Sequence, residues 1–209
     1  MRYEWERITS TAYLTLLELN FNEFPVDPKR IKNKGVVISS YQHYAKKTGL
    51  TVEQISLEHE LDDAFFLGEL RPGLKLILYN KEKYGARLKH TLWHEVGHVK
   101  LNHNAHTDRE EIEAHFFASQ ANAPNIIIKA ISNRGYKINT SLLMQTFELS
   151  KESANRKLEY LKKYSFEHEN EHDDTMLIQF SDFLNKNFPP KLQNSYDEEE
   201  ERQFERDNW

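Results

Sequence analysis

The spacing of apolar residues changes near residue 80 of the chain. Before that point they come in short runs bounded by polar or turn-forming residues, at Gly35–Ile38, Ala64–Leu67 and Leu74–Tyr79. Runs of this length and composition predict β-strands. Because Arg71–Gly73 places a Pro-Gly pair between the last two runs, we expect these two strands to pair as a hairpin.

Elsewhere the apolar residues recur at helical spacing. In the first part of the chain they predict a helix over residues 10–21 and another near residues 51–60, and Asp27 before Pro28 predicts a capped helical turn. The helices predicted after residue 80 are Lys81–Leu101, Asp108–Ala121, Asn125–Asn133, Asn139–Leu149, Lys151–Tyr164 and Thr175–Asn187. Strands followed by helices, without the alternation of a parallel α/β sheet, predict an α+β fold.

Length and composition narrow the class of protein. The chain has 209 residues and no cysteine, which excludes disulfide bonds, a thiolate nucleophile and Cys-ligated zinc or iron–sulfur sites. The length favours one domain with additional segments. We expect a main domain over residues 1–124, a helical subdomain over 125–166 and an acidic helix and tail over 167–209.

The net charge of −5 comes from the last residues of the chain. Residues 196–209 contain seven acidic and two basic residues, with five consecutive acids at Asp197–Glu201. Such a run repels itself and stays in solvent, so we interpret it as a solubilising tail or, alternatively, as a cover for a basic surface. The sequence has no signal-peptide pattern and no stretch approaching 18 apolar residues, which favours a soluble cytoplasmic protein without membrane contact.

The segment with clear chemical meaning is His94-Glu95-Val96-Gly97-His98. Two histidines four residues apart lie on one side of a helix, so both imidazoles can bind one ion. Glu95 lies elsewhere around the helix and can act as a general base, accepting a proton from water beside that ion. The apolar residues Leu88, Leu92, Val96 and Val99 form a separate stripe of the same helix. The alternative is a pair of structural histidines.

A catalytic ion needs a third protein ligand. His90 lies eight residues before the second histidine, about 12 Å along the helix axis, and is too far away to share the ion. Asp108 and Glu111 have the spacing of a capping pair that begins a second helix. Glu113 in that helix adjoins a stripe of small and apolar residues and is the preferred ligand, with Glu110 as the alternative. Glu110 and Glu111 are typical of acids in a first helical turn. The stripe consists of Ala114, Phe117, Ala118 and Ala121.

These segments resemble the ImmA/IrrE family of bacterial and phage metallo-endopeptidases. The resemblance depends on residues 94–103 (HEVGHVKLNH) and 111–118 (EIEAHFFA), with further agreement at residues 25–28 (PVDP), 77–80 (ILYN), Arg87 and Thr91. It covers about residues 10–165 and is most specific over residues 87–118.

The resemblance implies a zincin-like metallopeptidase fold, in which a small antiparallel sheet packs on the helix with the two histidines and a helical C-terminal subdomain follows. It implies His94, His98 and Glu113 as ligands of Zn²⁺, or of Mn²⁺ or another divalent ion, and Glu95 as catalytic base. The implied substrate is a helix-turn-helix transcriptional repressor. The strands over residues 64–79 could align an extended peptide along their edge.

Three positions depart from the family pattern. Trp93 stands where a small residue is common, His90 where an aromatic or apolar residue is usual, and His115 where Asn is common. These differences concern the shape of the site and leave the ligands intact. Peptide hydrolysis also requires a donor to the oxyanion, for which the candidates are His103, His106, His115 and Tyr136.

Residues 142–158 have the rhythm of a helix-turn-helix, in which one helix ends near Leu149 and Ser150 caps the next. The basic residues of the second helix, predicted to be exposed, are Arg156, Lys157, Lys162 and Lys163. They favour either DNA binding or a helical subdomain that packs on the peptidase or docks its substrate. The alternative function is therefore a DNA-binding or repressor-binding regulator with a structural metal and no protease activity.

Overall fold

The computed structural model describes residues 4–31, 35–57, 63–83, 85–105, 107–164 and 169–191. The predicted acidic run Asp197–Glu201 and the candidate donor His106 lie outside them. The strands are β1 (Val36–Ser40), β2 (Ala64–Arg71) and β3 (Leu74–Tyr79). The helices are α1 (Trp5–Glu18), η1 (Pro28–Arg30), α2 (Tyr41–Thr48), α3 (Val52–Leu57), α4 (Gly85–Lys100), α5 (Asp108–Asn122), α6 (Asn125–Asn133), α7 (Thr140–Phe147), α8 (Lys151–Tyr164), α9 (Asp173–Gln179) and α10 (Ser181–Asn187). This mixed, mostly helical structure confirms the predicted α+β class.

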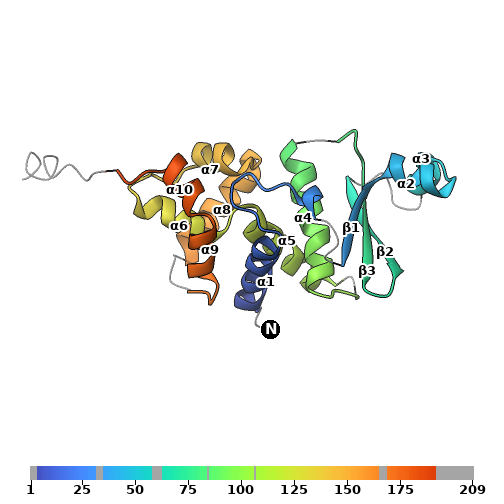
Figure 1. Cartoon of the computed structure of the whole chain (residues 1–209), viewed down its shortest axis with the longest axis horizontal. Coiled ribbons are helices and arrows are strands. Elements are labelled where there is room, and N and C mark those ends of the chain that lie inside the picture. Colours follow the sequence, from blue (N-terminus) through green and yellow to red (C-terminus); the bar gives the residue numbers. More distant parts are fainter. Residues whose placement is uncertain are drawn as a thin grey trace, which may run out of the picture.

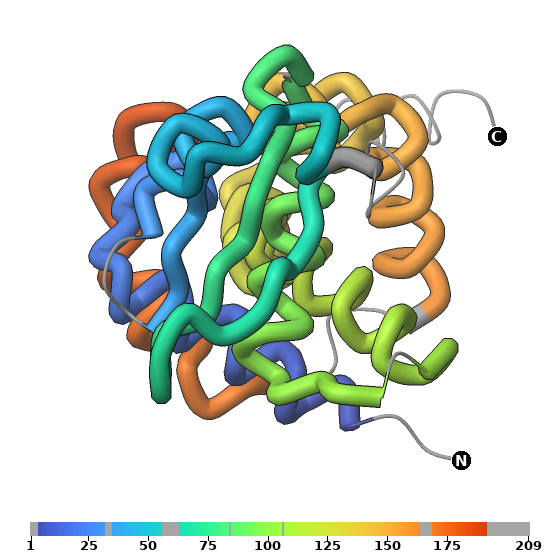
Figure 2. Tube along the Cα trace, turned by 90° about the vertical axis from the view of Figure 1, so that its right-hand side faces the viewer, coloured from blue at the N-terminus to red at the C-terminus, as the bar shows by residue number. Residues whose placement is uncertain are grey.

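The elements form successive layers (Figure 1). The sheet with α2 and α3 lies at one end, α4 and α5 lie in the middle, and α6 to α10 lie at the other end. Viewed from the sheet side, β1, β2 and β3 lie in front of α4 (Figure 2). The helix with the two histidines is therefore covered by the sheet on one side and by α5 on another.

The sheet has the strand order β1-β3-β2. The predicted hairpin is confirmed, because β2 pairs antiparallel with β3 across the turn at residues 72–73. The expectation of an antiparallel sheet is wrong for β1, which runs parallel to β3. Parallel neighbours require a long connection, and here α2, α3 and β2 provide it. Because β3 lies in the centre of the described sheet, β1 and β2 are its edge strands.

Some predicted helices have the predicted bounds and others do not. Both α6 and α8 begin and end where the pattern predicts, whereas the helix predicted over residues 175–187 is divided into α9 and α10 at Phe180. Helix α2 was not predicted. Its signals are the Ser40 hydroxyl, which accepts a hydrogen bond from His43 N at 3.2 Å, and Gly49, which ends the helix with a φ of 77°.

Close packing of α4 on α5 depends on Gly97. A Cβ atom at Gly97 would lie 3.1 Å from Phe117 Cδ1 and 3.3 Å from Ala114 Cα, closer than ordinary side-chain contacts. The predicted small-residue stripe of α5 meets α4 there, and its members are fully buried. Only glycine therefore fits at this point of α4 without moving α5.

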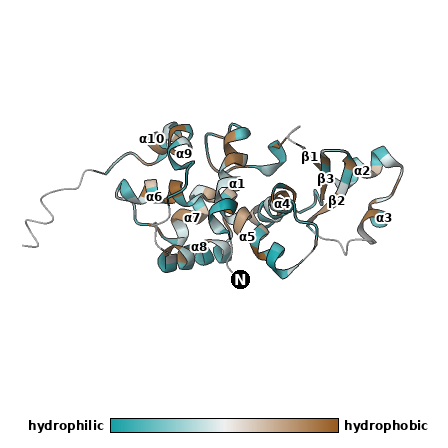
Figure 3. Ribbon diagram, turned by 90° about the horizontal axis from the view of Figure 1, so that it is seen from below, coloured by the Kyte–Doolittle hydropathy of each residue, from teal (hydrophilic) through white to brown (hydrophobic). Residues whose placement is uncertain are grey.

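Two apolar clusters support this arrangement. The larger extends from Ile8 in α1 to Phe188 after α10 and includes the buried side of α4, so all three predicted parts of the chain contribute to one core. The smaller, around Tyr41, Phe65 and Leu78, lies between the sheet and α2 and α3. Figure 3 shows hydrophobic residues along the strands and in α4 and α5, in the middle of the molecule. Within the described part of the chain, every helix is too short or too polar to cross a bilayer.

Candidate metal centre

The two histidines of α4 point the same ring nitrogen to one place. His94 Nε2 and His98 Nε2 lie 3.0 Å apart, as expected for residues one helical turn apart. Each of the two side chains is 11% exposed, so the imidazoles are largely buried but still reach the protein surface. The predicted convergence of these two side chains is present in the structure.

The carboxylate beside this pair belongs to Glu111. Its Oε2 lies 3.2 Å from His94 Nε2, and its Oε1 lies 3.4 Å from His98 Nε2. Around an ion with bonds of about 2.05 Å, tetrahedral ligand atoms lie about 3.3 Å apart. Each carboxylate oxygen of Glu111 therefore lies at about this separation from one of the two imidazole nitrogens, which themselves lie 3.0 Å apart. His94, Glu111 and His115 also form a group whose ligand atoms lie within 4.8 Å of one another.

Glu113, the predicted third ligand, is not brought to the histidine pair. Its Oε1 accepts a hydrogen bond from Arg109 Nε at 2.7 Å, and its Oε2 lies 3.3 Å from His103 Nε2 and 3.6 Å from Arg7 Nη2. The side chain is 4% exposed. Burial raises the pKa of Glu113, but the hydrogen bonds from Arg109 and His103 outweigh this effect and hold the pKa below its ordinary value.

The start of α5 explains the difference. The predicted capping pair Asp108 and Glu111 is wrong by one residue, because Thr107 is the N-cap and its partner in the capping box is Glu110. Glu110 is thereby used at the helix start, where it also accepts hydrogen bonds from the backbone of residues 104 and 105. Glu111 is left to face α4. Glu113 lies about 200° further round the helix.

Glu95, the predicted base, is held at the edge of the sheet. Its Oε2 accepts a hydrogen bond from the backbone N–H of Phe66 in β2 at 3.0 Å. Phe66 lies next to an irregularity in the pairing of β2 with β3, where Gly68 has a φ of 140°. The carboxylate of Glu95 is therefore anchored to the strand that borders the site.

Burial lowers the pKa of His90 and of His94 and so favours their neutral forms. Burial and the neighbouring His115, His98, His90 and His103 lower the pKa of His94 to about 3. Burial and the same His115, with Arg156, lower the pKa of His90 to about 4. A neutral imidazole has a free electron pair on one nitrogen, which is the form that binds a metal.

Two of the departures from the family pattern lie against each other. The rings of His90 and His115 are nearly parallel, at 8°, with centroids 5.7 Å apart. The ring of His115 also lies 4.3 Å from that of His94. His90 on α4 and His115 on α5, both unusual for the family, therefore stack on each other beside His94.

The candidate oxyanion donors have different positions. Tyr136 lies away from the histidines, because its hydroxyl donates to Pro189 O at 3.1 Å and its ring contacts Phe188. His103 lies behind His98, with its Nε2 beside Glu113. His115, which is exposed, is the described candidate at the open side of the pair.

The second helix of the helix-turn-helix pattern is capped as predicted, since Ser150 Oγ accepts a hydrogen bond from Ser153 N at 3.1 Å. The prediction that Lys157 is exposed is wrong. Lys157 is 3% exposed and its Nζ lies 3.3 Å from Ser119 Oγ on α5. Burial lowers the pKa of Lys157 to about 7. Arg156, Lys162 and Lys163 are exposed as predicted.

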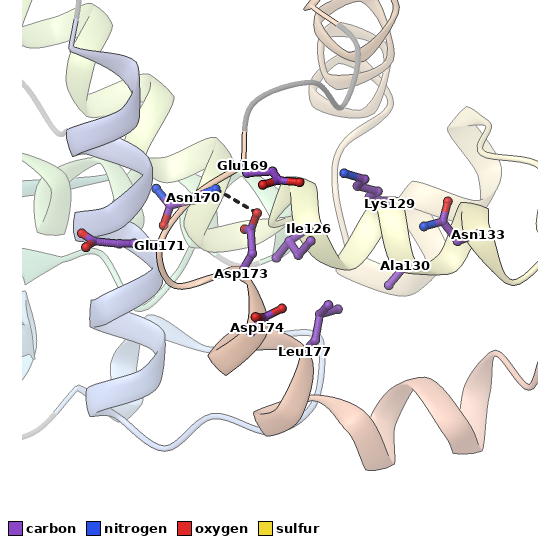
Figure 4. A pocket seen from close by; sticks show the side chains of 10 residues that line it. All are labelled: Ile126, Lys129, Ala130, Asn133, Glu169, Asn170, Glu171, Asp173, Asp174 and Leu177. Atoms are coloured by element: carbon purple, nitrogen blue, oxygen red, sulfur yellow. Dashed lines mark hydrogen bonds between the residues drawn. The ribbon is translucent and has the colours of Figure 1, made fainter.

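Two cavities of about 510 Å³ each lie elsewhere. One lies between α6 and α9, where Lys129 faces Glu169, Asp173 and Asp174 (Figure 4). The dashed line there marks the hydrogen bond from the backbone of Asn170 to Asp173. The other lies beside α7 and α10. The described residues that line them include none of the clustered histidines, so chemistry and not cavity size identifies the candidate site.

Comparison with known proteins gives one match. Residues 45–159, more than half of the chain, match a peptidase family model described as the IrrE N-terminal-like domain. No curated protein and no solved structure matches the chain. The matched segment contains α4 and α5, and with them His94, His98 and Glu111.

Proposed function

The chain belongs to the peptidase family with the IrrE N-terminal-like domain, and from this premise we propose that it is a metal-dependent endopeptidase. The observation that carries the proposal is the approach of Glu111 to both His94 and His98 at 3.2 and 3.4 Å. Two imidazoles and a carboxylate are a ligand set found in catalytic zinc sites, and they leave a coordination position for water.

We assign His94, His98 and Glu111 to the ion. Nitrogen and oxygen donors in this number suit Zn²⁺, and Mn²⁺ or another divalent ion accepts the same donors. When bound, such an ion makes water acidic near neutral pH and polarises a peptide carbonyl. Glu113 is not assigned to the ion, because Arg109 and His103 already use its carboxylate.

Glu95 acts as the general base in this proposal. Its carboxylate accepts a proton from the attacking water and gives it to the leaving amine. The hydrogen bond from Phe66 N to Oε2 at 3.0 Å orients the carboxylate. His115 is the donor proposed for the oxyanion, because it lies beside His94 on the open side.

The substrate proposed is a helix-turn-helix transcriptional repressor, cut in an extended segment. The edge strand β2 supports this proposal, since its outer edge lies free of a further strand in the described sheet and Glu95 is bound to that strand. A peptide can add to such an edge through main-chain hydrogen bonds, which would bring its backbone close to Glu95.

The direct test is incubation of the purified chain with the repressor encoded beside its gene, with Zn²⁺, with Mn²⁺ and with a chelator. We expect two defined fragments with metal, and none with the chelator or with Glu95→Gln. Binding of an intact repressor without fragments would instead support the repressor-binding regulator. DNA binding through the exposed basic residues of α8 would appear as salt-dependent binding to duplex DNA.

A further inference from the structure

The end of α4 folds His103 back onto His98. Asn102 has a left-handed conformation with a φ of 56°. His103 N donates to His98 O at 3.0 Å, and Asn102 N donates to Val99 O at 3.3 Å. These two hydrogen bonds define the Schellman motif, which reverses the chain after a helix. The His103 side chain is therefore returned to the last turn of the helix that it has just left.

The side chains continue this contact. His98 Nδ1 and His103 Nδ1 lie 3.1 Å apart, and His103 Nε2 lies 3.3 Å from Glu113 Oε2. The side chains of His103 and Glu113 are 6% and 4% exposed. Arg109 Nε fixes the other oxygen of Glu113 at 2.7 Å. The side chains of Glu113, His103 and His98 thus form a buried row of contacts. The row ends at His98 Nδ1, whereas His98 Nε2 lies beside Glu111.

The positions of the protons in this row follow from the chemistry of its members. A carboxylate can only accept, so Nε2 of His103 donates its proton to Glu113. When each of the two rings holds one proton, Nδ1 of His103 is the acceptor and the proton between the imidazoles belongs to Nδ1 of His98. His98 is left with its free electron pair on Nε2, the nitrogen that lies 3.4 Å from Glu111 Oε1.

We propose that His103 and Glu113 are positioning residues, which hold His98 in the tautomer and ring orientation that bind a metal ion through Nε2. The inference rests on the metal site proposed above. A partner on the second ring nitrogen of a ligand histidine fixes its tautomer and raises its basicity. His94 differs, because its buried Nδ1 has no hydrogen-bond partner among the described residues. The second histidine, not the first, is the oriented ligand.

The tautomers can be read directly in the metal-free full chain. Long-range ¹H–¹⁵N correlation spectra of histidine-labelled protein distinguish a proton on Nδ1 from one on Nε2, and His98→Gln and His103→Asn assign the two signals. We expect the proton of His98 on Nδ1 and that of His103 on Nε2. A proton on Nε2 of His98 in the native chain would overturn the proposal, whatever the variants do.

Zn²⁺ affinity tests the same row by competition with a chromophoric chelator. His103→Leu removes the acceptor for His98, and we expect binding about 10- to 100-fold weaker. Asn at the same position can place its amide oxygen near the site of Nδ1, so His103→Asn is expected to recover most of that loss. Glu18→Gln, which removes an exposed ion pair between α1 and α4 at 3.4 Å, is the matched control.

Equal affinities of the Leu, Asn and control variants would contradict the proposal. Should His103→Leu fail to fold by circular dichroism, the Asn variant and the tautomers of the native chain decide. Failure of the proposed function is distinguishable, since a chain that binds Zn²⁺ with the expected dependence on His103 but cuts no protein keeps this inference and loses the peptidase. Protein cleavage by a chain whose Zn²⁺ affinity does not depend on residue 103 would keep the proposed peptidase and overturn this inference.

Discussion

Glu111 and Glu113 lie two residues apart on α5 and have opposite surroundings. The Glu111 side chain is 46% exposed and faces His94 and His98. The Glu113 side chain is 4% exposed and is held by Arg109 and His103. Among the described contacts, Glu111 on the exposed side of α5 has no Lys or Arg partner. On the buried side, Arg109 already compensates the charge of Glu113.

A carboxylate near histidines is available to a metal ion only when no cation of the protein already binds it. Both residues are carboxylates near histidines, and both lie in the family-matched segment. In the proposed site the ion uses the exposed carboxylate of Glu111, whereas the compensated carboxylate of Glu113 holds Arg109 and His103.

Glu95→Gln is expected to have the largest effect on catalysis. It removes the proposed base, and Glu111 and Glu113 have the other roles proposed above. We expect kcat to fall by about 10²- to 10⁴-fold, with Zn²⁺ affinity nearly unchanged. Cleavage rates and chelator competition on the same preparation measure the two quantities. A variant that cuts at the native rate would assign the base to another residue.

Glu111→Gln and Glu113→Gln should separate ligand from positioning residue. We expect Zn²⁺ binding to weaken by more than about 100-fold in Glu111→Gln, and by about 10- to 100-fold in Glu113→Gln. Isothermal titration with Zn²⁺ gives both values. The opposite order would make Glu113 the ligand, as the sequence first indicated.

The stability of the metal-free protein should show the reverse order. Glu113→Ala leaves Arg109 and His103 without their carboxylate, and we expect a loss of about 1–3 kcal/mol in the free energy of unfolding. Glu111→Ala changes an exposed side chain, and we expect a change within about 0.5 kcal/mol. Urea denaturation of both variants, with chelator present, checks this. Equal losses of unfolding free energy in the two variants would contradict the contrast between an exposed Glu111 and a buried Glu113 that Arg109 and His103 bind.

The pH dependence of the metal-free protein follows from the buried histidines. The pKa values of His90 and His94 are lowered to about 4 and about 3, below the unfolded value of about 6.5. Between these values the unfolded chain binds more protons, so stability is full above pH 6.5 and falls as the pH decreases towards 4. The slope is at most about 1.4 kcal/mol per pH unit for each histidine.

Urea denaturation at pH 7, 6 and 5 measures this slope. His90→Phe removes one of the two groups and is expected to make the curve less steep in the same range. A native chain whose stability is flat between pH 7 and 5 would contradict the assignment of neutral, buried imidazoles beside α5.

The sequence predicted the elements better than the site. The bounds of α6 and α8, the hairpin of β2 and β3 and the convergence of His94 and His98 follow from spacing alone. Spacing contains no information about strand direction, so the parallel pairing of β1 with β3 was not predicted. Helix α2 is short and polar, and its signals at Ser40 and Gly49 are weak without a clear apolar stripe.

The acid of α5 that faces the two histidines could not be selected from the sequence, for a physical reason. The choice among Glu110, Glu111 and Glu113 depends on the rotation of α5, which is set by the Thr107–Glu110 capping box and by the contact of Gly97 with Phe117. A change of one residue in the helix start rotates every side chain by about 100°. Acids of the same type at successive positions therefore look equivalent until the packing is known.

We propose that one ion lies between the two imidazoles of α4 and the carboxylate of Glu111. Anomalous diffraction at the zinc edge, from crystals of the Zn²⁺-loaded chain, locates that ion. We expect one zinc peak at about 2.0–2.2 Å from His94 Nε2, His98 Nε2 and an oxygen of Glu111, with Glu113 still bound to Arg109. A peak bound to Glu113, or a peak away from the two histidines, would contradict it.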